Sequence, residues 1–352
     1  MTRRAGAWWI VALLSLSTPA AAADLLGQQA WVQYAQRFLL PEGRLRDDHA
    51  GDHSHSEGQG TALLLAERYG DQARFATIWQ WTHANLAVRG DALLAWRWDA
   101  SAGDHVPDRN NATDGDLLVA WALAEAAQRW NVADYRTAAI AIARTLRTKL
   151  LRTTPLGPVL LPGEHGFESA AGIVVNLSYA ILPAYRTLAT VDPDPAWTQL
   201  TEAHLRLVER AGFGRFMLPP DWLFVPKGWD PANNTPPLAP WQSRPARFGY
   251  DAIRVPLYLA WGGADGQLLG PFLKFWGFFE PLPFHPAWTD LSEDAVPLSD
   301  MPPGFRSIQK LAEAAQAGPA GGPAPGLSQD ENNYYSASLT LLAQLAWQDR
   351  GF

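Results

Sequence analysis

Acidic residues in three separate segments of this chain could together perform acid–base chemistry. Glu57 lies in a run of small and polar residues, His-Ser-His-Ser-Glu-Gly-Gln-Gly, at positions 53–60. Asp114 lies in a second such segment and Asp251 in a third. One carboxylic acid can donate a proton while a second, ionised carboxylate activates water, and this pair is what hydrolysis of a glycosidic bond requires. A third acid can hold a distorted sugar ring.

Glu57 also has two other interpretations. An acidic residue near the start of a helix is favoured by the helix dipole, so Glu57 could simply stabilise the helix predicted over residues 61–69. The nearby His53 and His55 raise the possibility of a metal site. However, the i, i+2 spacing of the two histidines on a loop is not a common ligand arrangement, and we expect no metal.

The aspartates have structural interpretations as well. Thr113 or Asp114 could be the N-cap of a long apolar helix, with Asp116 in its first turn. Asp251 and Arg254 could form a buried ion pair at i, i+3 spacing. Alternatively, Arg254 keeps Asp251 ionised so that it can act as a base. The sequence leaves these possibilities open.

The composition narrows the class of protein. The chain has 352 residues, a formal net charge of -7 and no basic stripe, which argues against a nucleic-acid-binding protein. It contains no cysteine, so disulfides, thiolate metal sites and a cysteine nucleophile are excluded. Its 17 tryptophans could fill the core or could line a cleft whose flat rings stack on sugars. Three acids and many tryptophans together favour hydrolysis of a neutral polysaccharide.

The first residues have the pattern of a secretory signal peptide. Arg3 and Arg4 precede a short apolar run, Ala7–Leu16, and Ala20–Ala23 supply small residues for cleavage. The run is too short to span a bilayer, and no other run reaches about 18 apolar residues. We therefore expect residues 1–23 to be removed and the protein to be exported to the periplasm or secreted.

Helical periodicity dominates the remaining residues, 24–352, which we interpret as one domain. We count eleven or twelve helices and almost no alternating strand pattern. In each pair the first helix is apolar on all sides and the second is amphipathic, which predicts an inner ring of helices surrounded by an outer ring. Helices are predicted over Ala170–Ala189 and over Tyr250–Trp261, the latter broken at Pro256. The proline-rich stretch Met217–Pro245 is predicted to be a long ordered excursion or a flap. The three acids precede inner helices and should meet at one end of the barrel.

Four segments resemble glycoside hydrolase family 8. The resemblance extends from about Leu26 to Trp347, and its strongest parts are Ala112–Trp130, Ser56–Gly60, Tyr250–Arg254 and Tyr334–Leu341. It implies an all-α fold, an (α/α)6 barrel of inner and outer helices, and hydrolysis with inversion of the anomeric configuration. It implies no cofactor.

The resemblance also implies a role for individual residues. Glu57 would be the general acid, Asp251 the general base, and Asp114 the residue that positions the sugar at the point of cleavage. Further substrate-binding residues would be Trp96, Trp98, Tyr250 and Arg254. The chain departs from the family pattern after Gly60, where Thr61-Ala62 replaces the common Tyr-Gly, so contacts of the cleft near the acid are expected to differ.

Within the family, the chain is most similar to the periplasmic endo-β-1,4-glucanases that accompany bacterial cellulose synthesis. This likeness implies a cellulase acting on β-1,4-glucan, working as a monomer and associated with the cellulose synthase export complex. Two alternatives remain: another family 8 β-glycanase, such as a xylanase, chitosanase or lichenase, and a non-catalytic glucan-binding component.

Overall fold

The computed structural model describes residues 19–47, 51–318, 324–327, 331 and 333–352. Of the predicted signal peptide, residues 1–18 lie outside the described residues. Within the described part of the chain there are eleven α-helices: α1 (Pro19–Phe38), α2 (Ser56–Arg68), α3 (Gln72–Leu86), α4 (Thr113–Trp130), α5 (Ala133–Leu150), α6 (Leu182–Val191), α7 (Ala196–Arg210), α8 (Arg254–Gly262), α9 (Gly270–Phe279), α10 (Pro303–Ala317) and α11 (Tyr334–Arg350). None of the described helices is both long and apolar enough to cross a membrane.

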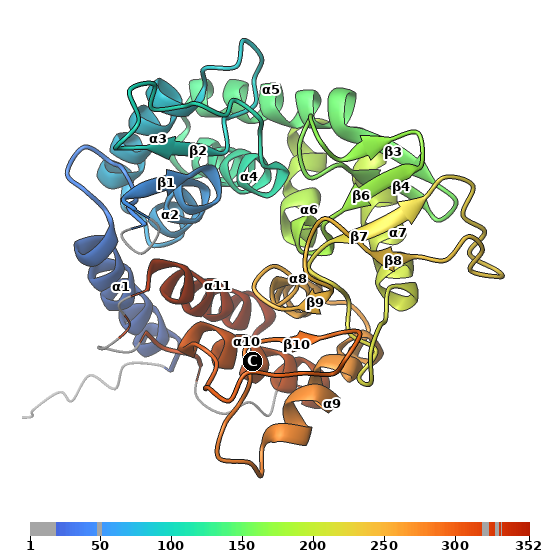
Figure 1. Cartoon of the computed structure of the whole chain (residues 1–352). Helices are drawn as coiled ribbons and strands as arrows, with labels where there is room; N and C mark the ends of the chain where they lie inside the picture. Colours follow the sequence, from blue (N-terminus) through green and yellow to red (C-terminus); the bar gives the residue numbers. More distant parts are fainter. Residues whose placement is uncertain (1–18, 48–50, 319–323, 328–330, 332) are drawn as a thin grey trace, which may run out of the picture.

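The helices form a barrel with two layers (Figure 1). Helices α2, α4, α6, α8 and α11 surround the centre, and the other helices lie outside them. The prediction of an all-α, (α/α)6-type barrel is confirmed. The predicted order of inner and outer helices fails only at the end of the chain, where the amphipathic α10 precedes the almost fully buried α11.

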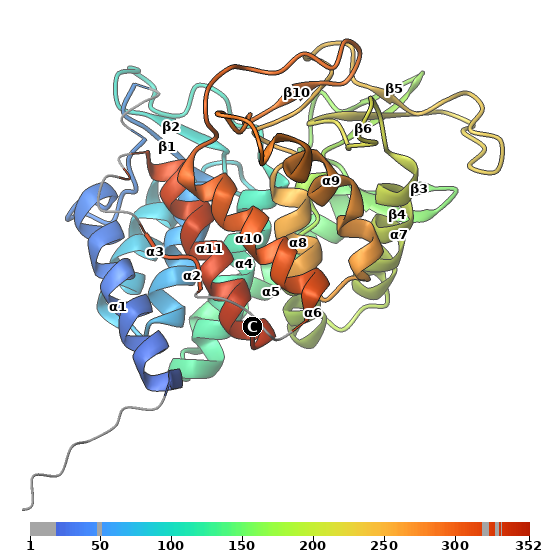
Figure 2. The same cartoon turned by 90° about the horizontal axis from the view of Figure 1, so that it is seen from below.

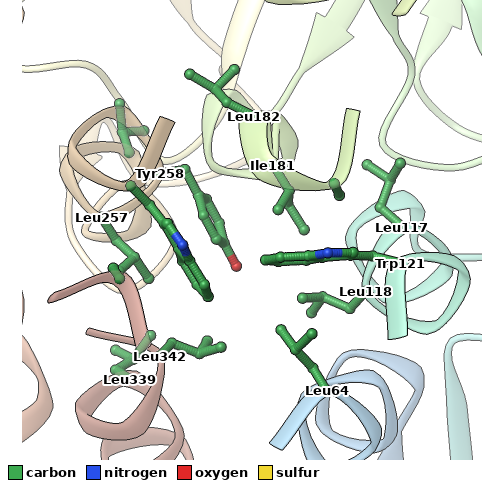
Figure 3. Close-up of a cluster of buried hydrophobic side chains, with 14 of the residues drawn as sticks. Leu64, Leu117, Leu118, Trp121, Ile181, Leu182, Leu257, Tyr258, Leu339 and Leu342 are labelled. Carbon is green, nitrogen blue, oxygen red and sulfur yellow. The ribbon is translucent and has the colours of Figure 1, made fainter. Parts of the chain in front are cut away.

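Side chains from all five inner helices meet on the barrel axis (Figure 3). Leu64 of α2, Trp121 of α4, Leu182 of α6, Tyr258 of α8 and Leu342 of α11 are at most 3% exposed. An inner helix packs on every side, so its sequence must be apolar all round, as in the Leu-Leu-Val-Ala-Trp-Ala-Leu run of α4. This packing closes the centre of the barrel and leaves its ends to carry polar groups.

Short strands were largely missed by the sequence analysis. The described residues hold one four-stranded antiparallel sheet and three strand pairs. The strands are β1 (His53–His55), β2 (Arg97–Asp99), β3 (Leu151–Thr154), β4 (Gly157–Leu160), β5 (Glu168–Ser169), β6 (Gly172–Val175), β7 (Leu223–Pro226), β8 (Ala239–Pro240), β9 (Arg247–Phe248) and β10 (Thr289–Asp290). With two to four residues each, they are too short to show a period-2 pattern.

Two predicted segments were wrong in detail, and a third contains strands that were not predicted. Ala170–Ala189 is not one helix, because the β-branched Ile-Val-Val of β6 forms a strand and α6 starts only at Leu182. Met217–Pro245 contains β7 and β8 of the four-stranded sheet. Pro256 does not break α8, because it lies in the first turn, where no backbone N–H is needed for the helix.

The strands and long loops gather at one end of the barrel, opposite the end where the chain terminates (Figure 2). Strand β1 leads directly into α2, and the chain from β9 leads into α8. The inner helices α2, α4, α8 and α11 therefore begin at this end. The prediction that the three acids share one end of the barrel is confirmed.

Candidate active site

One buried arginine brings the three acids together. Arg254, the first residue of α8, is 2% exposed. Its Nη1 donates to Glu57 Oε1 and to Asp114 Oδ2, the latter at 2.8 Å, and its Nη2 donates to Asp251 Oδ1 at 3.0 Å. The predicted Asp251–Arg254 pair therefore exists, and it is part of a larger cluster that joins segments 197 residues apart.

Glu57 is the second residue of α2, and its side chain is 27% exposed. Burial raises the pKa of Glu57 from 4.5 to about 7. The Arg254 guanidinium opposes this rise, and the negative charges of Asp114 and Asp251 reinforce it. A carboxyl with this pKa is substantially protonated near neutral pH while still reachable from solvent, which suits a proton donor.

Asp114 is the second residue of α4, with its side chain only 2% exposed. Burial raises its pKa, again against the attraction of Arg254. The predicted N-cap role is wrong for Asp114 and Thr113, because α4 begins at Thr113 and its N-cap is Ala112. Asp114 Oδ1 instead accepts from the backbone N–H of the following Gly115 at 2.9 Å.

Gly115 lets α4 approach α2 closely. A Cβ at this position would lie 2.1 Å from Ser56 Oγ and 2.7 Å from the backbone nitrogen of Glu57. Only glycine therefore allows the starts of the two helices to lie so near each other, and this contact places Asp114 beside Glu57 at Arg254.

Asp116 serves a neighbouring loop and not the cluster. Its Oδ1 accepts from the backbone N–H of Leu94 at 2.8 Å and its Oδ2 from Asn111 Nδ2 at 2.9 Å. Burial raises the pKa of Asp116 to about 8. The carboxyl ties down both ends of the loop that carries Trp96 and Trp98.

Trp96 lies beside the segment of the acid. Strands β1 and β2 are antiparallel, and one further bond joins the backbone N–H of Ser56 to the carbonyl of Trp96 at 2.9 Å. The half-buried Trp96 ring stacks on His55 with centroids 5.8 Å apart and planes inclined by 20°. Trp98, by contrast, pairs with Ser54, two residues further from Glu57 along β1, and its ring packs against Trp81 and His105. The structure thus places Trp96 nearer to the acid segment than Trp98.

The two histidines before Glu57 have other partners. His53 Nε2 lies 3.2 Å from Asp99 Oδ2, and His55 stacks on Trp96 and on Tyr334. Burial lowers the pKa of His55 to about 4, so its ring is neutral and aromatic in character. Among the described residues, no group of three or more His, Cys, Asp or Glu side chains is arranged to hold a metal ion.

Tyrosines complete the surroundings of the acids. Tyr250 is 43% exposed, packs edge-on against Phe305, and accepts a hydrogen bond at its carbonyl from Tyr335 Oη at 2.5 Å. The ring centroid of Tyr179 lies 5.5 Å from Arg254 Cζ. Tyr179 and Tyr335 were not predicted as site residues. The Tyr334-Tyr335 pair at the start of α11 was a usable signal, whereas nothing in the sequence around Tyr179 marks it.

Comparisons with known proteins agree with this geometry. The family model described as glycosyl hydrolases family 8 matches residues 2–349. A probable endoglucanase from Novacetimonas hansenii is 39% identical over 328 residues, which is 92% of each chain. An endoglucanase from Cellulomonas uda is 36% identical over 81% of this chain and 77% of its own. The solved structure of an endo-β-1,4-glucanase from Acetobacter xylinum superposes with a TM-score of 0.84 at 36% identity, covering 94% of this chain and all of that one.

Proposed function

Because this chain belongs to family 8 of the glycosyl hydrolases and is a glycoside hydrolase, we propose that it cleaves internal β-1,4 bonds of glucan chains with inversion. The arrangement that supports this proposal most directly is the sharing of Arg254 by Glu57, Asp114 and Asp251, one of which has a pKa near 7.

In the proposed mechanism Glu57 donates its proton to the glycosidic oxygen as the bond to the anomeric carbon breaks. A water molecule attacks that carbon from the opposite face, and Asp251 accepts the proton that the water loses. Asp114, held by Arg254, hydrogen-bonds the sugar at the cleavage point. Trp96 supplies an aromatic surface for a neighbouring sugar. Glu57 then takes up a proton from solvent and Asp251 releases one, so both acids regain their starting states.

The activity is tested with cellopentaose and carboxymethylcellulose, using Glu57→Gln and Asp251→Asn as controls. We expect the wild-type protein to release shorter cello-oligosaccharides and either variant to release almost none. Proton NMR of the first products should show the α-anomer. An initial β-anomer would mean retention, in which the second carboxylate attacks the sugar directly, and would remove the role of general base given to Asp251. Inverting enzymes hold the two carboxyl groups about 6.5–9.5 Å apart to leave room for water, whereas retaining enzymes hold them about 5 Å apart.

The same assay separates the substrate alternatives. Faster release of products from xylan, chitosan or mixed-linkage glucan than from carboxymethylcellulose would assign the enzyme to that glycan. Binding of cello-oligosaccharides without turnover by the wild-type chain would instead indicate a glucan-binding component.

We further propose that the enzyme is exported and acts as a monomer on glucan chains beside the cellulose synthase export complex. The support is the signal-peptide pattern of residues 1–23 and the sequence likeness to periplasmic endoglucanases. N-terminal sequencing of the periplasmic protein should begin at Asp24, and light scattering should give the mass of one chain. A protein that stays in the cytoplasm with residues 1–23 still attached would contradict this proposal.

A further inference from the structure

Asp221 is a buried acid outside the cluster at Arg254. It lies two residues before β7 and is 4% exposed. Its Oδ1 accepts three backbone N–H groups at 2.9, 3.1 and 2.8 Å, those of Gly249, Asp251 and Ala252. A single carboxylate oxygen thus holds the turn that carries Asp251.

The other atoms of Asp221 fasten the approach to this turn. Its Oδ2 accepts from Arg247 Nε at 3.1 Å, and its backbone N–H donates to the Arg247 carbonyl at 2.7 Å. A Cβ on Gly249 would lie 3.1 Å from Asp221 Oδ2, so the turn fits closely around the carboxylate. The Asp221 side chain thus binds this segment at Arg247, Gly249, Asp251 and Ala252.

The start of helix α8 depends on the same turn. Its N-cap, Ile253, makes no side-chain hydrogen bond, although the helix begins immediately with Arg254. The backbone N–H groups of Ile253, Arg254 and Val255 donate instead to carbonyls of the turn that Asp221 holds, those of Gly249, Asp251 and Ala252, at 2.9, 3.1 and 3.0 Å. The position of Arg254, and of the acids that it binds, depends on the same turn.

Burying the Asp221 carboxylate would be unfavourable if the side chain only filled space. Burial and the charge of Asp251 raise the pKa of Asp221, so an ionised carboxylate is costly at this point. An apolar residue would avoid that cost, but it could not accept the three N–H groups of the turn. A buried ionisable group that lowers the stability of the fold and lies next to reacting groups is typical of a functional position.

We propose that Asp221 is a positioning residue for hydrolysis, which holds the Asp251 turn and the start of α8 so that the base keeps its place relative to Glu57. This inference rests on the proposed function, in which Asp251 activates water. Asp221 itself touches neither water nor sugar in the mechanism.

Two substitutions test the inference. Asp221→Ala removes every acceptor. Asp221→Asn keeps an oxygen for the N–H groups, and Arg247, whose side chain is 36% exposed, can turn toward solvent. We expect Asp221→Ala to lower kcat about 100-fold, because small misplacements of catalytic groups cost that much, with KM for cellopentaose nearly unchanged. We expect Asp221→Asn to recover roughly tenfold of that loss.

Hydrogen exchange gives a measurement that does not depend on activity. Among residues 249–252, the three amides that donate to Asp221, those of Gly249, Asp251 and Ala252, should be protected in the wild-type protein and should exchange faster in Asp221→Ala. Asp192→Ala is the matched control, since Asp192 is also buried and bonded to two arginines, at the end of α6. It should lower stability but leave kcat and the exchange of residues 249–252 unchanged.

The outcomes are distinguishable. Unchanged exchange of residues 249–252 in Asp221→Ala would overturn the inference even if the wild type hydrolysed no glycan. Changed exchange with unaltered kcat, an Asn variant no better than Ala, or an equal effect of Asp192→Ala on kcat would also overturn it. A wild type inactive on every β-glycan would refute the proposed function alone.

Discussion

Replacing Glu57 by glutamine should abolish activity and yet stabilise the protein at alkaline pH. In the folded protein the pKa of Glu57 is about 7, against an ordinary value of 4.5. The folded protein therefore binds more protons than the unfolded chain between these two values. Stability contributed by this group falls as pH rises through that window, because the folded state must then hold a buried charge. Glutamine has the shape of the protonated acid and carries no such charge.

The size of the effect follows from the pKa. The rise from 4.5 to about 7 corresponds to about 3 kcal/mol at a pH above both values. The side chain is 27% exposed and shares Arg254 with two other acids, so solvent and neighbouring protonation will absorb part of it. We expect Glu57→Gln to be about 1–3 kcal/mol more stable than the wild type at pH 8.

Urea unfolding of both proteins at pH 4 and pH 8 measures this difference. At pH 4 the two should be nearly equally stable, because Glu57 is then protonated in the folded and largely in the unfolded protein. Glu42→Gln, which removes an exposed carboxylate, serves as the control and should change the stability at pH 8 less than Glu57→Gln does. A Glu57→Gln protein less stable than the wild type at pH 8, or a difference independent of pH, would refute the reasoning.

Three further predictions follow from the site. Arg254→Met should cost about 3–5 kcal/mol in urea unfolding, because it leaves the buried Asp114 carboxylate without its cation, and a loss below 1 kcal/mol would contradict the ion-pair account. Trp96→Ala should weaken binding of cellopentaose by about 0.5–1.5 kcal/mol in calorimetry, while Trp98→Ala should bind it normally. Equal losses in the two variants would contradict the proposal that Trp96 is the tryptophan that stacks on the sugar. Gly115→Ala should destabilise the protein by about 1–3 kcal/mol and reduce kcat, since its methyl group would push the start of α2; a fully active variant would show that the close approach is dispensable.

The sequence was sufficient to predict the barrel and the end at which the acids meet. Inner helices must be apolar on all sides, and this requirement is visible in α4 and α11 without knowledge of their neighbours. The strands around the site were not predictable in the same way. Residues 172–175 form β6 because β7 lies beside them, and that partner stands some 50 positions later in the chain.

Long-range contacts explain what the sequence missed at the site. The i, i+3 spacing indicated that Arg254 pairs with Asp251, but no spacing could indicate that the same guanidinium also binds Glu57 and Asp114. Asp221 was overlooked for a similar reason, because its partners are the backbone N–H groups of Gly249, Asp251 and Ala252, which carry no mark in the sequence. Thr61 is 2% exposed within α2, and the expected difference in cleft contacts near the acid stays a prediction.

The charges gathered at Arg254 explain why the site holds a proton. One guanidinium faces three carboxylates, and if all three were ionised the buried cluster would carry an excess of two negative charges. Protonation of one acid reduces that excess, and Glu57, whose side chain is 27% exposed, can exchange its proton with water after each turnover. The remaining negative charge has a role in catalysis. As Glu57 gives its proton to the leaving oxygen, positive charge develops on the sugar in an oxocarbenium-like state, and the neighbouring carboxylates stabilise that charge.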